Sequence, residues 1–339
     1  MAPKVAIHAR EGSFSGRWIE YCQQNNIPYK IVNCHANDVS AQLQGIEALL
    51  WHWAYQVPAD VLVAKPILRM AERVGIKVYP NLATCWHFDD KVSQKYLLEF
   101  LDAPLVPTFI FFDQKDAFDW IEKTSFPIVF KLSKGAGSAN VRLVKNAAEA
   151  RSLVKKAFGP GIAQSGGYFI DLNKKVTRVK SRKDYLGVLS RMPRAVLEAR
   201  KRNAERVLEK NYVYFQEFVP DNLYDTRITI IGKRAFGFTR NVRKNDFRAS
   251  GSGAIDYDSE RVDPECIQIA FDVAQRIGSQ SLAFDFVKTA DRKPIILEVS
   301  YGFNAEAVHA CLGYWDSELN WHEGQYWPQE LILTDLLSC

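Results

Sequence analysis

The strongest constraint on the fold is a regular alternation of apolar runs and amphipathic stretches over residues 1–82. Each apolar run has the length of a buried strand, and each amphipathic stretch has the length of a helix. Parallel strands need a crossover connection, usually a helix, so this alternation predicts a parallel α/β domain. Strands are expected at 4–9, 29–34, the end of 38–53 and 76–81, and helices at 15–26, the start of 38–53 and 59–75.

A sheet of this kind binds ligands at the carboxyl ends of its strands. The segment REGSFSGR (10–17) follows the first strand and leads into a helix, so its backbone N–H groups and serine hydroxyls suit an anion. An ordinary strand–helix loop has the same composition, and both interpretations stay open.

The pattern changes after residue 82. A middle region combines strands with helices, and strands dominate the rest of the chain. The class is therefore predicted to be α/β, with α+β character in the C-terminal part. Helices are expected at 89–103, 116–125, 147–158 and 264–278, and the predicted domains are 1–82, 83–160 and 161–339.

The composition is typical of a soluble globular protein, since 47% of the residues are hydrophobic and 24% are charged. No apolar run approaches the roughly 20 residues of a membrane span, and the N-terminus lacks the apolar stretch of a signal peptide. The six cysteines are scattered without C-x-x-C spacing, which argues against a disulfide framework or a zinc site. A cytoplasmic location is predicted.

A basic segment at 174–210 carries thirteen Lys or Arg and only four Asp or Glu residues, although the net charge of the whole chain is +5. Such a segment is either a solvated helical face or a surface that meets an anion. We expect a helical flap over the mouth of an active site, where it would meet an anionic substrate.

Two neighbouring apolar runs, SLAFDFVK (281–288) and PIILEVS (294–300), each contain one acid in the middle. If the turn between them is centred between residues 291 and 292, Asp285 and Glu298 face each other on the same face of a hairpin. Opposed like charges are destabilising, so a positive group is expected between them. A Mg²⁺ ion suits two carboxylates, and an Arg or Lys from elsewhere is the alternative.

The segment KLSKGAGSAN (131–140) begins at the end of an apolar strand and continues as a loop of small residues. Successive backbone N–H groups in such a loop can bind phosphate, and Lys131 and Lys134 add positive charge. The segment is not a Walker A motif, and a flexible turn is the alternative interpretation.

The order of these motifs resembles the ATP-grasp superfamily, the fold of glutathione synthetase and D-alanine–D-alanine ligase. The similarity rests on DDK at a helix start, PIVFK before the small-residue loop, YFQEFVP, DTRITIIGKRAFGFTR and the Asp-then-Glu strand pair. It covers roughly residues 80–305 and implies an ATP-grasp fold behind an N-terminal parallel α/β domain. The flanks WHFDDK and GYWDSELNWHEG look like an ATP-grasp group found in polysaccharide-biosynthesis loci.

The resemblance implies an ATP site. Arg240, with Arg227 and Arg243, would neutralise the phosphoryl group during its transfer. Asp225 would take the ribose, and residues 216–219 would read adenine through the backbone. The residues that the resemblance assigns to ATP are Lys91 (with Lys95 as a substitute), Lys131, Lys134, Gly135, Gly137, Ser138, Gln216, Glu217, Phe218, Val219 and Asp225.

The resemblance also implies a magnesium site at Asp285 and Glu298. The family usually has Glu-x-Asn, but Ser300 stands at the Asn position here. Asn304 is the nearest asparagine that would substitute for it as a metal ligand. A second metal site is therefore in doubt, whereas the first is not.

The implied activity is ATP-dependent ligation of a carboxylate to an amine through an acylphosphate. The expected substrates are a uronic acid or sugar-linked carboxylate and an amino acid or small amine, either of which can be phosphorylated. The alternatives are a kinase of the same fold that acts on a polyol, and an anion-binding module without catalysis. No nucleic acid partner is expected, and a homodimer is left open.

The histidines divide into two groups. His52 and His87 are flanked by aromatic residues, which favours core positions. His309 and His322 lie beyond the acidic strand pair, where acceptor substrates of this fold bind. The surrounding segment 309–327 is rich in Trp, Tyr and acids, which suits either a sugar-binding platform or a helix-loop packed on a core.

Overall fold

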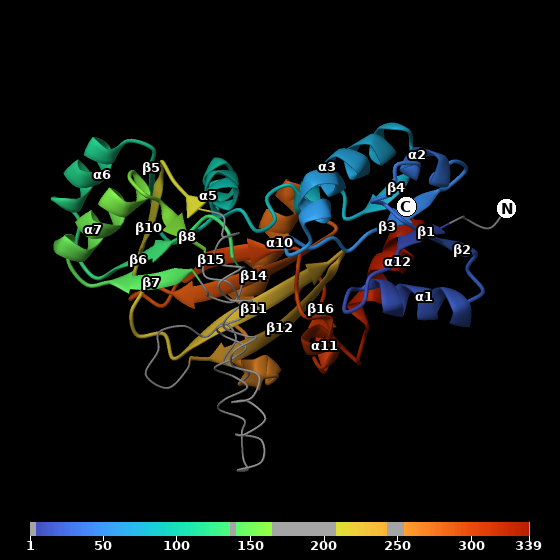
Figure 1. Cartoon of the computed structure of the whole chain (residues 1–339). Coiled ribbons are helices and arrows are strands. Elements are labelled where there is room, and N and C mark those ends of the chain that lie inside the picture. The colour runs from blue at the N-terminus through green and yellow to red at the C-terminus, as the bar shows by residue number, and fades with distance from the viewer. Residues whose placement is uncertain (1–4, 136–139, 165–207, 243–253, 339) are drawn as a thin grey trace, which may run out of the picture. The chain divides into compact units, whose positions relative to one another are not determined.

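The structure is a computed structural model, and it describes residues 5–135, 140–164, 208–242 and 254–338 (Figure 1). Nearly all of the basic segment 174–210 therefore lies outside the described residues. The chain forms two compact units, which are described in turn. Unit 1 comprises Met1–Val106 and Val219–Cys339, and unit 2 comprises Pro107–Phe218. The three domains predicted from the sequence divide the chain differently and stay a prediction.

Unit 1 begins with the predicted parallel sheet, whose strand order is β2-β1-β3-β4. The helix expected from residue 38 is a single turn, and Gly45, with a φ of 66°, lies between it and the next strand. The parallel α/β prediction is confirmed. The elements are β1 (Val5–His8), α1 (Ser15–Gln24), β2 (Tyr29–Val32), α2 (Val39–Gln42), β3 (Ala48–Leu50), α3 (Pro58–Arg73), β4 (Lys77–Tyr79), α4 (Leu82–Cys85) and α5 (Lys91–Phe100).

The second sheet of unit 1 has the order β15-β14-β11-β12-β16-β17, with β13 paired to β12. Its pairings are antiparallel, as expected for the strand-rich C-terminal part. The elements are β11 (Tyr224–Ile231), β12 (Arg234–Asn241), β13 (Ile255–Asp256), η1 (Ser259–Arg261), α10 (Pro264–Ile277), β14 (Ser281–Lys288), β15 (Pro294–Ser300), α11 (Ala305–His309), β16 (Gly313–Trp315), β17 (Trp321–Glu323) and α12 (Pro328–Ser338).

Alternation along the strands of this second sheet separates its two faces. Ile228, Phe284 and Val299 point to one face and share a buried cluster with residues of α10. The other face contributes Phe236 and Ala283 to a second cluster with α1 and α12. Figure 1 shows α12 beside α1, next to the parallel sheet.

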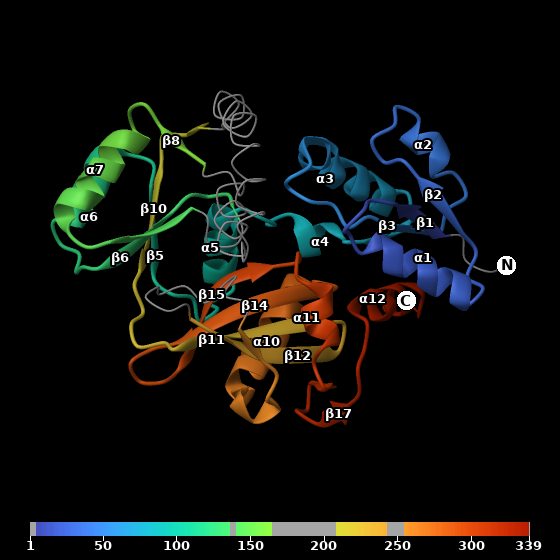
Figure 2. The same cartoon turned by 60° about the horizontal axis from the view of Figure 1, so that its bottom comes forward.

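Unit 2 contains one antiparallel sheet with the order β5-β10-β6-β7. The helices α6 and α7 pack together on one face of it, over a core that includes Phe130 and Phe215 (Figure 2). A two-residue pair, β8 with β9, stands apart from this sheet. The elements are β5 (Thr108–Phe111), α6 (Gln114–Ile121), β6 (Ile128–Lys131), β7 (Val141–Val144), α7 (Ala147–Ala157), β8 (Ile162–Ala163), β9 (Leu208–Glu209) and β10 (Val213–Glu217).

Two local predictions were wrong. The helix expected from residue 116 begins at Gln114, because the Asp113 carboxylate accepts hydrogen bonds from the Lys115 and Asp116 N–H groups and caps it. Of the two interpretations left open for segment 309–327, the helix-loop is the wrong one: the segment contains the β16–β17 hairpin, whose Tyr314 side chain stacks on His322. No helix among the described residues is both long and apolar enough to span a membrane.

Candidate functional site

A row of charged side chains crosses four strands of the second sheet of unit 1. Glu298 on β15 pairs with Asp285 on β14, and Asp285 also pairs with Arg227 on β11. Asp225, two residues before Arg227, pairs with Arg240 on β12. Direct cross-strand partners and residues two apart share a face, so all five side chains lie on the face opposite α10.

The predicted pairing of Asp285 with Glu298 is confirmed, but the register beyond it was predicted incorrectly. Between Asp285 and Phe286 the pairing shifts by one residue, so that Phe286 faces Ile296 and not Leu297. Leu297 is the extra residue of a β-bulge. The bulge compensates for a hairpin turn that is centred half a residue earlier than expected.

Arginines surround the Asp285 carboxylate. Arg227 donates through Nε and Nη2 at 2.6 and 2.7 Å, and Arg240 Nη2 lies 2.9 Å from Oδ2. Burial alone would raise the pKa of Asp285, but the charges and hydrogen bonds of the two arginines hold it well below its usual range. The arginine alternative kept open from the sequence is thus present in the structure.

Arg240 is also held from its other side by Asp225. Its Nε and Nη2 groups donate to the two Asp225 oxygens at 2.7 and 2.6 Å, and both side chains are buried. Burial and the nearby Asp285 charge raise the pKa of Asp225, and the arginines offset only part of this effect. Both Asp225 oxygens bond to Arg240, and its predicted contact with a ribose stays a prediction.

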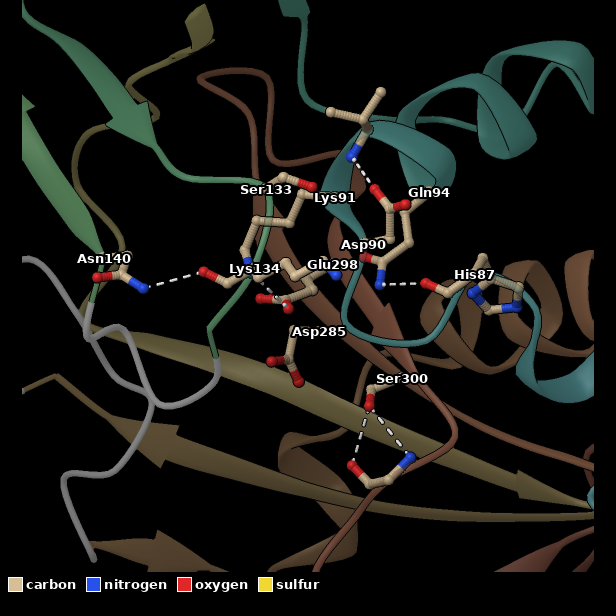
Figure 3. Close-up of polar contacts among 12 residues, drawn as sticks. His87, Asp90, Lys91, Gln94, Ser133, Lys134, Asn140, Asp285, Glu298 and Ser300 are labelled. Carbon is tan, nitrogen blue, oxygen red and sulfur yellow. Dashed lines mark hydrogen bonds and ion pairs between the residues drawn. The ribbon is translucent and has the colours of Figure 1, made fainter. Parts of the chain in front are cut away.

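Glu298 pairs with Lys91, whose Nζ lies 3.6 Å from Oε1 (Figure 3). Lys91 is the first residue of α5 and is 4% exposed, whereas the Glu298 side chain is 34% exposed. Lys95, the substitute considered for Lys91, instead pairs with Glu99 at 2.6 Å and lies over the Tyr96 ring. The geometry favours Lys91 as the lysine that belongs to the charged row.

The donor set fits one divalent cation. A carboxylate has about four lone-pair positions, and the three arginine N–H groups at Asp285 leave room for one further contact. Glu298, which is partly exposed, can supply a second oxygen, and water or phosphate can complete the shell of Mg²⁺. A second cation has less support. Ser300 Oγ bonds to the Gly302 backbone (Figure 3), and Asn304 Oδ1 caps α11.

Unit 2 carries the small-residue loop, which starts where β6 ends at Lys131. Lys131 is 5% exposed. Gly135 has a φ of 118°, and a Cβ added to it would lie 2.4 Å from Asn140 Nδ2. Asn140 Nδ2 in turn donates to the Lys134 carbonyl at 2.9 Å, which joins the two ends of the loop (Figure 3). Gly137 and Ser138, like the candidate Arg243, lie outside the described residues.

The predicted adenine-reading segment spans the end of β10. Gln216 is buried, and its Nε2 donates to Thr108 Oγ1 at 2.9 Å. The Glu217 N–H donates to the Pro107 carbonyl at 2.9 Å, and the Glu217 side chain is exposed. Phe218 ends unit 2 and Val219 opens the second stretch of unit 1. The adenine role of this segment stays a prediction.

The interpretation of His87 as a core residue is confirmed, since its side chain is fully buried, whereas His52 is half-buried. His52 stacks on Phe14 with ring centroids 3.8 Å apart, and its Nδ1 accepts the Phe14 N–H. Burial lowers the pKa of His52 to about 3 and that of His87 to about 4. His309 stacks on Trp327 and His322 bonds to Asp316, so both have structural partners, and their predicted substrate role stays a prediction.

A polar cluster at the parallel sheet was missed in the sequence. His35 Nε2 bonds to the fully buried Asp60 at 2.7 Å, and His8 lies within 4.8 Å of both groups. The His8 Nδ1 accepts the Cys34 N–H at 3.0 Å, so the neutral ring carries its proton on Nε2 and offers a metal no lone pair there. Burial lowers the pKa of His8, which favours that neutral form. The cluster is therefore a hydrogen-bonded part of the domain.

The chain is similar to known proteins in sequence and in fold. No protein-family model matches the chain. The α-aminoadipate–LysW ligase LysX of Saccharolobus solfataricus is 24% identical over 232 residues, which are 68% of this chain and 68% of LysX.

Two solved structures cover almost the whole chain. The RimK domain ATP-grasp protein of Sphaerobacter thermophilus matches with a TM-score of 0.55 and 15% identity, over 99% of this chain and 100% of that one. The biotin carboxylase domain of Hydrogenobacter thermophilus 2-oxoglutarate carboxylase, solved with MgADP, ADP and bicarbonate, matches with a TM-score of 0.60 and 13% identity, over 99% of this chain and 69% of that one. Identities this low establish a shared fold.

Proposed function

The chain has the ATP-grasp fold that its motifs resemble, and on this premise we propose that it is an ATP-dependent carboxylate–amine ligase that uses Mg²⁺. The observation that carries the proposal is the charged row of unit 1. Three anions (Asp225, Asp285 and Glu298) are paired with three cations (Arg227, Arg240 and Lys91). A bound Mg²⁺ would leave this row with a positive excess that suits phosphate.

Each residue has a role that follows from its contacts. Asp285 and Glu298 would hold Mg²⁺, which neutralises phosphate charge when it is bound. Arg240 would neutralise the transferring phosphoryl group, and its bidentate bonds to Asp225 fix its orientation before substrate arrives. Positioning and charge neutralisation supply most of the barrier reduction in phosphoryl transfer, so no general base is required for this step.

The reaction would proceed in two steps. A carboxylate oxygen attacks the γ-phosphorus of ATP and ADP leaves, which gives an acylphosphate. The amine then attacks the acyl carbon, and phosphate departs with the original carboxylate oxygen. The name of LysX, a ligase that acts on α-aminoadipate and LysW, supports an amino acid as one substrate.

A sugar-linked carboxylate remains the more specific proposal for the acid. It is supported by the aromatic hairpin β16–β17, in which Trp315 and Trp321 pack together and Trp321 is 40% exposed. The narrower likeness to a polysaccharide-biosynthesis group stays a prediction.

Product analysis tests the ligase proposal. The protein is incubated with ATP, Mg²⁺ and pools of uronic acids, amino acids and small amines, and phosphate and new masses are followed. A ligase releases ADP and phosphate only when an acid and an amine are both present. Transfer of phosphate to a polyol without an amine would establish the kinase alternative instead.

A further inference from the structure

A carboxylate occupies the backbone N–H groups at the start of the small-residue loop in unit 2. Glu209 Oε2 accepts the Ser133 N–H at 2.9 Å, and Glu209 Oε1 accepts the Lys134 N–H at 3.4 Å. Ser133 and Lys134 lie just beyond the end of β6 at Lys131, whereas Glu209 lies in β9, 75 residues after Lys134. The contact is therefore tertiary and is not imposed by the local chain.

Two further side chains hold the same carboxylate. Gln164 Nε2 donates to Oε1 at 2.6 Å, and the Tyr212 hydroxyl donates to Oε2 and also accepts the Ser133 N–H at 2.7 Å. Every donor to Glu209 within the described residues is electrically neutral. Among the residues that the structure describes, Glu209 is thus held by neutral donors, which is how backbone amides also hold a phosphate oxygen.

We propose that Glu209 is an internal ligand of this loop, and that a nucleotide phosphate reaches the Ser133 and Lys134 N–H groups only after the Glu209 carboxylate leaves them. The carboxylate oxygens stand where phosphate oxygens would be bound. An anion at this position also repels an approaching phosphate, so Glu209 lowers the affinity of the loop. That the phosphate belongs to ATP rests on the proposed function. That the Glu209 carboxylate occupies the Ser133 and Lys134 N–H groups is independent of the proposed function.

A supporting role for Glu209 would have the opposite consequence. If the carboxylate only held the loop in its binding shape, its removal would weaken phosphate binding. If it competes, its removal strengthens phosphate binding. The sign of the affinity change therefore separates the two roles.

The test measures binding of ADP, adenosine and inorganic tripolyphosphate to the full chain by calorimetry. In Glu209→Gln, one amide oxygen remains but the NH₂ group cannot accept the second backbone N–H. ADP and tripolyphosphate should bind roughly tenfold more tightly than to the wild type, because one charge-assisted competitor is gone, while adenosine affinity stays unchanged. Tyr212→Phe, which removes one donor to the carboxylate, should give a smaller gain in the same direction.

Glu149→Gln is the matched control, since Glu149 also accepts a backbone N–H in unit 2, from Lys145 at 3.1 Å. It should leave all three affinities at the wild-type value. Weaker or unchanged tripolyphosphate binding in a folded Glu209→Gln protein, checked by its thermal midpoint without ligand, would overturn the proposal. A gain for tripolyphosphate without any binding of ADP would uphold the role of Glu209 and contradict the ligase proposal instead.

Discussion

Asp285 and Glu298 face each other across β14 and β15, yet each finds its counter-charge elsewhere: Asp285 in Arg227 and Arg240, and Glu298 in Lys91. Two opposed carboxylates in adjacent strands are thereby tolerated without sharing a single cation. Because their partners differ, the two acids should contribute differently to the stability of the fold, although both are proposed to hold the same metal ion.

The first prediction concerns the different contributions of Asp285 and Glu298 to stability. Asp285→Asn should lower the free energy of unfolding by roughly 3 kcal/mol, because it leaves two largely buried arginines without their full counter-charge. Glu298→Gln should change it by less than about 1 kcal/mol, since the Glu298 side chain is one-third exposed and its partner is a single lysine at 3.6 Å. Urea unfolding measures both values, and both variants should lose ATP turnover. Equal stability losses would contradict the assignment of the arginines to Asp285.

The second prediction concerns the role of Asp225 in orienting Arg240. Asp225→Asn should lower kcat by at least about tenfold while the affinity for ATP changes little, because Arg240 would act on charge that develops during transfer. The matched control is Asp335→Asn, which breaks a comparable contact with Arg234 away from the charged row. A fall in ATP affinity with normal kcat would instead show that Asp225 contributes to the binding of ATP and not to the transfer step.

A third prediction tests the start of the small-residue loop. Lys131→Met keeps most of the side-chain volume at a buried position but removes its charge, so ATP affinity should fall by more than about tenfold, as expected for a lost contact with phosphate. Lys115→Met, an exposed lysine of the same unit, is the control and should bind ATP normally. Unchanged ATP affinity in calorimetry of Lys131→Met would exclude this lysine from the phosphate site.

The fourth prediction follows from the buried His87 and the half-buried His52. The pKa of His52 is lowered to about 3 and that of His87 to about 4, whereas both titrate near 6.5 in the unfolded chain. The unfolded state therefore binds more protons below pH 6.5, and stability must fall as the pH drops towards 4. The slope should approach about 1.4 kcal/mol per pH unit for each histidine. Urea unfolding at a series of pH values measures it.

His87→Gln should reduce that slope by about 1.4 kcal/mol per pH unit, the contribution of one histidine. A wild-type stability that is flat between pH 6.5 and 4.5 would contradict the burial of these rings in neutral form.

The sequence predicts those parts of the structure that depend on local pattern. The parallel domain follows from the alternation of strands and helices, and the Asp285–Glu298 pairing follows from two misplaced acids and a short turn. The bulge at Leu297 leaves no mark in a continuous apolar run, so the register beyond the pair was predicted incorrectly.

Side-chain partners from distant segments could not be predicted in this way. The bonds from Arg227 and Arg240 to Asp285 depend on which strands are neighbours in the sheet. Glu209 falls within the basic segment 174–210, whose composition indicates a positively charged surface. No sequence pattern links Glu209 to the Ser133 N–H group, which is 76 residues away. Such contacts depend on the packed tertiary structure, whereas periodicity reports only on single elements.

The transfer of a carboxylate oxygen to phosphate tests the central claim most directly. Once an acid substrate is found, it is labelled with ¹⁸O in its carboxylate and incubated with ATP, Mg²⁺ and the amine, and the mass of the released phosphate is measured. Each phosphate should carry one ¹⁸O from the acid, and Glu298→Gln should form no labelled phosphate. Phosphate without label, formed while the acid keeps both of its ¹⁸O atoms, would contradict the central claim.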